Sequence, residues 1–446
     1  MKILHYSLGL PPYRAGGLTK YCMDLMKVQQ EAGHQVELLW PGVLSDGETK
    51  VIQKKRKYHI DNYEIINPLP VSLLGGIKDF EAYTRTVDKK PFIDFLKEKQ
   101  YDVIHLHTIM GLPKEFLEVA RMLEIKVVYT SHDFFGVCPT GNFMLDDAPC
   151  RFDPECKACA WCCRNATPMK KVKVKQGKLY RAIKSIHFVN KFKKVKRKQI
   201  LAASWQALSE QEQKQYASQG EQYQKLREYY YGIFNLISEI HFNSSGTEAF
   251  YRAIGVQTKG KVINISNLNI GEHRKKKELN DVIRIGFLGA TSKRKGYLLL
   301  VETLNELQKE FEGKFELHSF FNSTIEESYI VHHKSYTPAT LGNVMDSIDF
   351  AVAPSICAET FSFNVQEALC YGVPVVVSSY VGAKDLLENG KSGIVFGTTK
   401  EELKECLRGI LSNPEKISEM NRYIVEHGSV KTMKMHGKEM IEFYQS

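Results

Sequence analysis

The hydrophobic pattern near the start of the chain predicts a β-α-β unit. Residues 2–6 form a short apolar run, and residues 9–17 are rich in Gly and Pro, which break regular structure and let the backbone approach a ligand. Across residues 18–31 apolar side chains recur at helical spacing, and a second apolar run covers residues 36–40. Such a unit implies parallel strands joined by a right-handed crossover.

The same alternation recurs along the rest of the chain. Further strands are expected at residues 103–106, 127–130, 239–242, 283–288, 315–320, 350–353 and 373–377, with helical patterns between them. Two doubly wound, Rossmann-like α/β domains facing each other across a cleft are the simplest account. Functional residues should then lie on the loops that follow the strands.

The pattern also predicts domain limits. We expect a first domain over residues 1–275, a second over 276–425, and a C-terminal helix over 426–446 that packs back on the first domain. Residues 259–277 are predicted to connect the domains. From about residue 134 to 235 an insertion interrupts the first domain; it includes a polar helical stretch over residues 202–228. Insertions on a rigid scaffold often carry specificity.

Composition narrows the class of protein. With 446 residues, 43% hydrophobic and 25% charged, the chain is typical of a globular protein of two or three domains, not of a disordered chain or a small binding module. No apolar run approaches the length of a membrane-spanning helix, and the first residues lack the apolar region of a signal peptide. We therefore expect a cytoplasmic protein whose ten cysteines are thiols or metal ligands.

The positive charge is concentrated in one segment. The chain carries a net charge of +10, and residues 170–198 hold 13 Lys and Arg and no acid. Apolar side chains from Leu179 to Val195 recur there at spacings of three and four, which predicts an amphipathic helix. We expect it to bind an anionic membrane at the inner face of the cell membrane; a solvated basic face and a nucleic-acid site are the rival interpretations.

Six of the ten cysteines fall within 26 positions of the insertion. The spacing Cys156-x2-Cys159 suits metal ligands, and the candidates for a structural zinc are Cys138, Cys150, Cys156 and Cys159, with Cys162 or Cys163 as substitutes. Reduced thiols, a local disulfide pair and an iron–sulfur cluster are alternatives.

Two loops of the second half carry residues suited to a phosphorylated ligand. After a predicted strand, Glu359 and Glu367 lie eight positions apart around an expected helix start capped by Ser362, where free N–H groups would face a phosphate. The acids could accept hydrogen bonds from sugar or ribose hydroxyls. In the loop at residues 286–296, three consecutive cations, Lys293, Arg294 and Lys295, would neutralise a diphosphate leaving group.

These motifs, in this order, resemble the retaining glycosyltransferases of family 4, which have the GT-B fold. The resemblance rests on the Glu-x7-Glu pair Glu359 and Glu367, the Gly-Val-Pro after it, the basic Gly loop, the N-terminal Gly16-Gly17, and the runs VIHLHT at residues 103–108 and TSHD at 130–133. It covers nearly the whole chain apart from the insertion.

The resemblance implies a role for each matching residue. Glu367 would hold the nucleotide ribose, Glu359 would contact the donor sugar, and Lys295 with Arg294 would bind the diphosphate. Gly17 belongs to a loop that closes over the diphosphate, His107 would line the donor-sugar site as a catalytic residue beside Glu359, and Ser362 and Phe363 would contact the donor. This chain departs from the family pattern at Ala290, where an arginine is common, and at Ser362, where a glycine is usual.

The implied activity is metal-independent, retaining transfer of a hexose from a nucleotide diphosphate sugar, UDP-sugar ahead of GDP-sugar. The acceptor would be a glycan or a lipid-linked sugar in cell-surface polysaccharide biosynthesis, and no cofactor is required for catalysis. No Asp-x-Asp metal motif is present. Two alternatives remain: a nucleic-acid-binding protein that uses the insertion on an inactive scaffold, and a phosphorylase or nucleotide-sugar hydrolase of the same fold.

Overall fold

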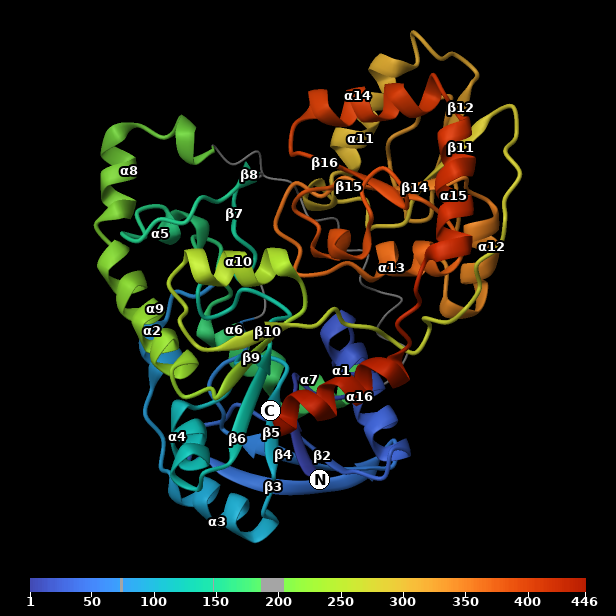
Figure 1. Ribbon diagram of the computed structural model, residues 1–446. Coiled ribbons are helices and arrows are strands. Elements are labelled where there is room, and N and C mark those ends of the chain that lie inside the picture. Colours follow the sequence, from blue (N-terminus) through green and yellow to red (C-terminus); the bar gives the residue numbers. More distant parts are fainter. Residues whose placement is uncertain (73–74, 147, 186–203) are drawn as a thin grey trace.

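An eight-stranded sheet forms the centre of the first domain (Figure 1), with the order β10-β9-β6-β5-β1-β2-β4-β3. All neighbouring strands are parallel except β3 and β4. The strands are β1 (Lys2–Tyr6), β2 (Gln35–Pro41), β3 (Lys50–Lys57), β4 (Ile60–Ile66), β5 (Val103–Leu106), β6 (Lys126–Thr130), β9 (Glu239–Phe242) and β10 (Gly260–Val262). The computed structural model describes residues 1–72, 75–146, 148–185 and 204–446.

Helices cover both faces of this sheet, as the buried central strands require. They are α1 (Gly17–Glu31), α2 (Phe80–Thr84), α3 (Lys90–Lys99), α4 (Lys114–Met122) and α10 (Ser245–Ala253). Helix α1 buries Tyr21, Cys22, Leu25 and Met26, the apolar positions whose spacing predicted it.

The second domain contains a six-stranded, fully parallel sheet with the order β13-β12-β11-β14-β15-β16. Its strands are β11 (Ile283–Phe287), β12 (Phe315–Ser319), β13 (Ile330–His332), β14 (Phe350–Ala353), β15 (Val375–Ser378) and β16 (Gly393–Phe396). Its helices are α11 (Tyr297–Leu307), α12 (Leu341–Asp346), α13 (Phe363–Cys370), α14 (Lys400–Leu411) and α15 (Glu415–His427), with a short 3-10 turn, η3, at Lys293–Lys295. Two doubly wound α/β domains are therefore confirmed.

The last helix, α16 (Met433–Gln445), lies against the first domain although it follows the second in sequence (Figure 1). It packs beside α1, and its buried side chains include His436, Met440, Phe443 and Tyr444. The side chain of Lys126, at the start of β6, donates a hydrogen bond to the carbonyl of Phe443 at 3.1 Å.

The connecting segment is shared between the two domains. Strand β10 pairs with β9, so the segment expected to link the domains begins inside the first sheet. Further along, the Arg274 guanidinium donates to the carbonyl of Ile424 at 2.9 Å on α15, so this residue packs on the second domain. The chain therefore crosses between the domains after β10 and before Arg274.

The insertion folds against the first domain. It contains β7 (Met144–Leu145), β8 (Ala148–Pro149), α5 (Cys159–Cys162), α6 (Met169–Gln176), α7 (Lys178–Ser185), α8 (Glu210–Ala217) and α9 (Gly220–Phe234). Helix α9 buries Tyr223, Leu226, Tyr230, Ile233 and Phe234 in the core of the first domain.

The polar stretch expected to be helical over residues 202–228 is helical over most of its described length, but it is not continuous. The chain forms two helices, α8 and α9, and the second continues to Phe234; residues 202 and 203 lie outside the described residues. At the start of α9, a Cβ on Gly220 would lie 2.5 Å from the carbonyl oxygen of Glu155. The joint between the helices therefore needs a glycine, because the cysteine-rich loop crosses it at backbone contact.

Candidate functional site

A cavity of about 350 Å³ lies between the two domains, beyond the carboxyl ends of their parallel strands. The first domain contributes the start of α1 and residues 132–134 after β6. The second contributes Arg294, Lys295 and residues 358–364, which lead into α13. The loops expected to carry function therefore meet at one place.

Two helix N-termini face each other across this cavity. A Cβ on Gly17, the first residue of α1, would lie 3.8 Å from Cε2 of Phe363, the first residue of α13. Free backbone N–H groups at helix starts attract anions. The Asn364 side chain donates to the carbonyl of Leu288 at 2.8 Å, which ties α13 to the loop after β11.

Ser362 occupies the N-cap position of α13, as predicted, but its hydroxyl caps nothing. Its backbone has φ 153° and ψ 102°, a region that L-residues rarely adopt. The strain explains why a glycine suits this position better, and it leaves the N-terminal N–H groups of α13 without a side-chain acceptor from Ser362.

Glu359 and Lys295 form an ion pair in the cavity. The Lys295 Nζ donates to Oε2 of Glu359 at 2.6 Å, and the Ser355 hydroxyl donates to the other carboxylate oxygen. Next to the lysine, Gly296 lets the chain pass against Pro354, because a Cβ there would lie 1.8 Å from the Pro354 carbonyl oxygen. The pair presents one cation and one hydrogen-bond acceptor to the same cavity.

Glu367 lies farther along α13 and is 9% exposed. Burial raises the pKa of its carboxyl to about 7, and the charge of Lys20 on α1 opposes that rise. The residue does not line the cavity described above. A carboxyl with this pKa gains or loses its charge near neutral pH.

His107 does not line the cavity, so its expected place beside the donor sugar stays a prediction. Its side chain is fully buried, and its backbone N–H donates to the carbonyl of Tyr6 at 2.9 Å, which extends the pairing of β5 with β1 by one residue. His132, which follows β6, lines the cavity instead. Burial lowers the pKa of His132 to about 3, so the ring is neutral.

Asp133 also lines the cavity, and it was not among the predicted site residues. Its carboxylate accepts from the backbone N–H of Phe135 at 2.9 Å, and burial raises its pKa to about 6. The signal for both residues was the TSHD run directly after a predicted strand, since that is where parallel sheets place ligand contacts.

A second cavity, of about 520 Å³, shares Gly141, Asn142 and Arg294 with the first. Its other walls come mainly from the insertion and from Ser72, Gly75 and Gly76. The Asn142 amide oxygen accepts from the Thr140 hydroxyl at 2.9 Å and from the Met144 N–H at 3.1 Å, which fixes the side chain at the junction. The two cavities therefore adjoin at these residues.

Models of two glycosyltransferase domains match this chain. The model described as glycosyltransferase family 4 covers residues 15–154, and the model described as glycosyl transferases group 1 covers residues 282–413. The chain belongs to the family 4 glycosyltransferases. A comparison with curated protein sequences found no match.

Solved structures with the GT-B arrangement resemble this glycosyltransferase over its whole length. Sucrose-phosphate synthase from Thermosynechococcus elongatus is 14% identical with a TM-score of 0.58, covering 100% of this chain and 98% of its own. Anabaena Alr3699/HepE in complex with UDP and glucose is 13% identical with a TM-score of 0.54, and WaaG, a glycosyltransferase involved in lipopolysaccharide biosynthesis, is 13% identical with a TM-score of 0.55. Both comparisons cover 100% of each chain. At these identities the likeness shows the fold.

The cysteines of this glycosyltransferase lie near one another but do not form a ligand set in the structure. Burial raises the pKa of the Cys150 thiol to about 11, and Cys138 and Cys156 are close enough to add to that rise. Within the described parts of the chain, no three cysteine sulfurs lie within 4.8 Å of one another. The structural zinc therefore stays a prediction.

The basic segment forms helices α6 and α7 up to Ser185, and residues 186–198 lie outside the described residues. Three large apolar side chains are exposed here, Val174 at 66%, Leu179 at 76% and Ile183 at 43%. The Lys184 Nζ donates to the carbonyl of Tyr13 at 2.6 Å, so α7 lies beside the N-terminal loop that leads to Gly17. Among the described helices, none is both long enough and apolar enough to cross a bilayer.

Proposed function

We propose that this glycosyltransferase moves a hexose from a nucleotide diphosphate sugar, UDP-sugar ahead of GDP-sugar, to a hydroxyl of a glycan or a lipid-linked acceptor. The observation that carries the proposal is the Lys295–Glu359 ion pair at 2.6 Å in the interdomain cavity, beside the uncapped start of α13. The complex of the Anabaena protein with UDP and glucose supports a uridine nucleotide donor.

The diphosphate would bind between Lys295, Arg294 and the start of α13. On its arrival Lys295 would exchange its bond to Glu359 for one to a phosphate oxygen, leaving the carboxylate to accept from donor-sugar hydroxyls. As the bond from the anomeric carbon to the phosphate oxygen breaks, the cations and helix N–H groups stabilise the charge that develops on the leaving group. Side chains and backbone of this chain supply that stabilisation, so the proposed reaction needs no metal.

The acceptor hydroxyl would attack the anomeric carbon from the side that the diphosphate leaves, which retains the configuration. A new carbon–oxygen bond forms as the bond to the phosphate breaks, and the hydroxyl proton passes to the departing phosphate oxygen. No side chain is then required as general base. His132 and Asp133 lie in the same cavity and would contact the donor sugar, the role expected of His107.

Glu367 would accept hydrogen bonds from the ribose hydroxyls of the nucleotide, the role that the family resemblance implies. Its neutral fraction near pH 7 would weaken that contact, because a protonated carboxyl offers fewer acceptor sites than a carboxylate.

The second cavity is our proposed acceptor site. It opens onto the donor cavity at Asn142 and Arg294, so an acceptor hydroxyl there would reach the donor from the first-domain side. Because Thr140, Gly141 and Asn165 line it as well, its walls offer amide, hydroxyl and backbone groups suited to sugar hydroxyls. The insertion that forms it would then determine acceptor choice.

Helices α6 and α7 would hold the enzyme on an anionic membrane, where a lipid-linked acceptor of cell-surface polysaccharide biosynthesis would be met. The exposed Val174, Leu179 and Ile183 would enter the headgroup region, and the surrounding lysines would contact anionic lipid. We expect wild type to sediment with vesicles containing phosphatidylglycerol but not with pure phosphatidylcholine. Leu179→Glu should lose this binding, and Met122→Glu, at an apolar residue 57% exposed on α4, should keep it. Equal binding of both variants would contradict this membrane site.

Nucleotide binding tests the donor site directly. UDP, GDP, ADP and CMP are titrated against thermal unfolding, because a ligand at 100 times its Kd stabilises by about 2.7 kcal/mol. We expect one diphosphate to stabilise wild type and Lys391→Ala but not Lys295→Ala. Lys391 is a matched control, since it pairs with Glu388 at 3.2 Å on the surface. If no nucleotide stabilises wild type, or if Lys295→Ala binds as wild type does, the donor site is refuted.

A further inference from the structure

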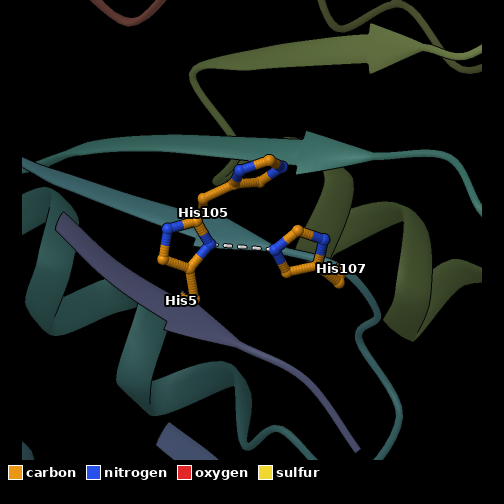
Figure 2. A group of neighbouring side chains, drawn as sticks. All are labelled: His5, His105 and His107. Atoms are coloured by element: carbon orange, nitrogen blue, oxygen red, sulfur yellow. Dashed lines mark hydrogen bonds between the residues drawn. The ribbon is translucent and has the colours of Figure 1, made fainter. Parts of the chain in front are cut away.

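Below the donor cavity, a row of fully buried histidines crosses the first sheet. His5 lies on β1, His105 lies on β5 and His107 follows β5 (Figure 2). His241 lies on β9. Burial lowers the pKa of His5 to about 4 and lowers the pKa values of the other three well below their usual range. All four rings are therefore neutral. A neutral imidazole has one nitrogen that donates and one that accepts.

The direction of the hydrogen bonds is fixed at one end by a main-chain carbonyl. The Ile263 oxygen can only accept, so His241 donates to it from Nε2 at 2.7 Å. Nδ1 of His241 must then accept from the Thr130 hydroxyl at 2.8 Å. Since that hydroxyl has a single proton, its oxygen accepts from Nε2 of His105 at 2.7 Å.

The chain of bonds continues through a residue of the C-terminal helix. Nδ1 of His105 accepts from the Tyr444 hydroxyl at 2.6 Å, which in turn accepts from the Gln29 amide at 3.1 Å. The Gln29 oxygen accepts from Nε2 of His5 at 2.8 Å, so Nδ1 of His5 must accept from Nε2 of His107 at 3.0 Å (Figure 2). Every ring in the row therefore has one defined tautomer.

These bonds also decide between two interpretations of the cluster. The ligand nitrogens of His5, His105 and His107 lie within 4.8 Å of one another, as a metal site would require. However, both nitrogens of His5 and both of His105 already have partners. The geometry favours a hydrogen-bonded network over a metal centre.

The network ends against His132 in the donor cavity. The His107 ring stacks on His132 with centroids 5.7 Å apart, and Tyr21 meets His132 edge-on at 4.7 Å. The Tyr21 hydroxyl is itself hydrogen-bonded to Nε2 of His436 on α16 at 2.7 Å. Nε2 of His132 is buried and has no hydrogen-bond partner within the described residues. The His132 side chain is therefore held by packing against the His107 and Tyr21 rings.

We propose that helix α16 positions His132 for the reaction, through Tyr444 and the histidine row on one side and through His436 and Tyr21 on the other. Tyr444 and His436 are then positioning residues that contact no substrate. This inference rests on the proposed function, in which His132 contacts the donor sugar. Helix α16 follows the second domain in sequence, but under this proposal it contributes to the first domain's side of the site.

Tyr444→Phe tests the proposal, because it keeps the ring and removes only the hydroxyl that joins His105 to Gln29. We expect turnover to fall about tenfold or more, while the KM for the donor and the stabilisation by nucleotide stay as in wild type. In a His132→Ala background the same substitution should have no further effect on turnover. Ring-nitrogen NMR shifts give a readout that needs no activity: His107 should change from one tautomer to a mixture.

Tyr423→Phe is the matched control, since its hydroxyl donates to Glu388 at 2.6 Å on the surface of the second domain. Unchanged turnover in Tyr444→Phe, an equal loss with and without His132, or an unchanged His107 tautomer would each overturn the positioning role. Failure of nucleotide to stabilise wild type would overturn the proposed function instead, so the two failures are distinguishable.

Discussion

Acidification should destabilise the first domain through its buried histidines, and the contribution of His5 can be worked out. Burial lowers the pKa of His5 from 6.5 to about 4, although its bond to Gln29 opposes the shift. Between these values the unfolded chain binds a proton that the folded domain excludes, so stability is lost as the pH falls through this window. At about 1.4 kcal/mol per pKa unit, His5 alone accounts for a loss of about 3 kcal/mol.

The three tryptophans offer a selective probe, because Trp40, Trp161 and Trp205 all belong to the first domain or its insertion. Urea unfolding followed by tryptophan fluorescence would give the free energy of unfolding at each pH from 7 to 4.5. We expect His5→Gln to be less stable than wild type at pH 7 but to lose less stability below pH 6.5. For His5→Gln, the free energy of unfolding should change less steeply with pH than for wild type, by up to about 1.4 kcal/mol per pH unit.

An exposed histidine in the same domain provides the control. His59 lies in the turn between β3 and β4 with φ 61°, and His59→Asn keeps a residue type that tolerates this backbone conformation. Its slope should match that of wild type. If His5→Gln shows the wild-type slope as well, the folded-state pKa of His5 is not lowered and the reasoning fails.

Three further predictions concern the cleft. Because the pKa of Glu367 is about 7, nucleotide affinity should rise as the pH increases from 6 to 8, and Glu367→Gln should remove this dependence; calorimetric titration would measure both. Ser362→Gly should relieve the strain at φ 153° and raise the second domain's unfolding temperature in scanning calorimetry, by a net free energy on the order of 1 kcal/mol; a lower temperature would contradict it. Gly296→Ala should abolish nucleotide binding, because its Cβ would lie 1.8 Å from the Pro354 oxygen, whereas Gly313→Ala, with a similar φ of 69° and open space around it, should bind normally; equal binding would show that the turn can shift.

The sequence predicted the central strands of both sheets and missed strands at or next to their edges. Residues 103–106 and 350–353 are short apolar runs, and the structure has β5 and β14 at the same positions. The hairpin of β3 and β4 was not predicted, because β3 is Lys-rich and largely exposed, and its pattern resembles a loop. Such charge on an edge strand prevents pairing with other chains, so the feature that hid the strand also protects the sheet.

The second-domain side of the site was accessible from sequence because its residues lie in two short motifs that each follow a predicted strand. The structure brings Glu359, Lys295 and Ser362 to one cavity, and each was named from a loop that follows a strand. The first-domain side was less accessible. His107 and His132 both follow strands, and the sequence does not tell which of the two rings turns toward the cavity and which turns under the sheet.

The strand order decides that question, and strand order is a tertiary property. His5 and His105 are paired in register between β1 and β5, and Thr130 and His241 are paired between β6 and β9. His107 is two residues beyond His105, so it lies on the same face of the sheet, the one covered by α1 and α16. On that face His5 is hydrogen-bonded to Gln29 and His105 to Tyr444, so the histidines there belong to one polar network. His132 lies beyond the end of β6, where no neighbouring strand continues the pairing, and it lines the cavity between the domains.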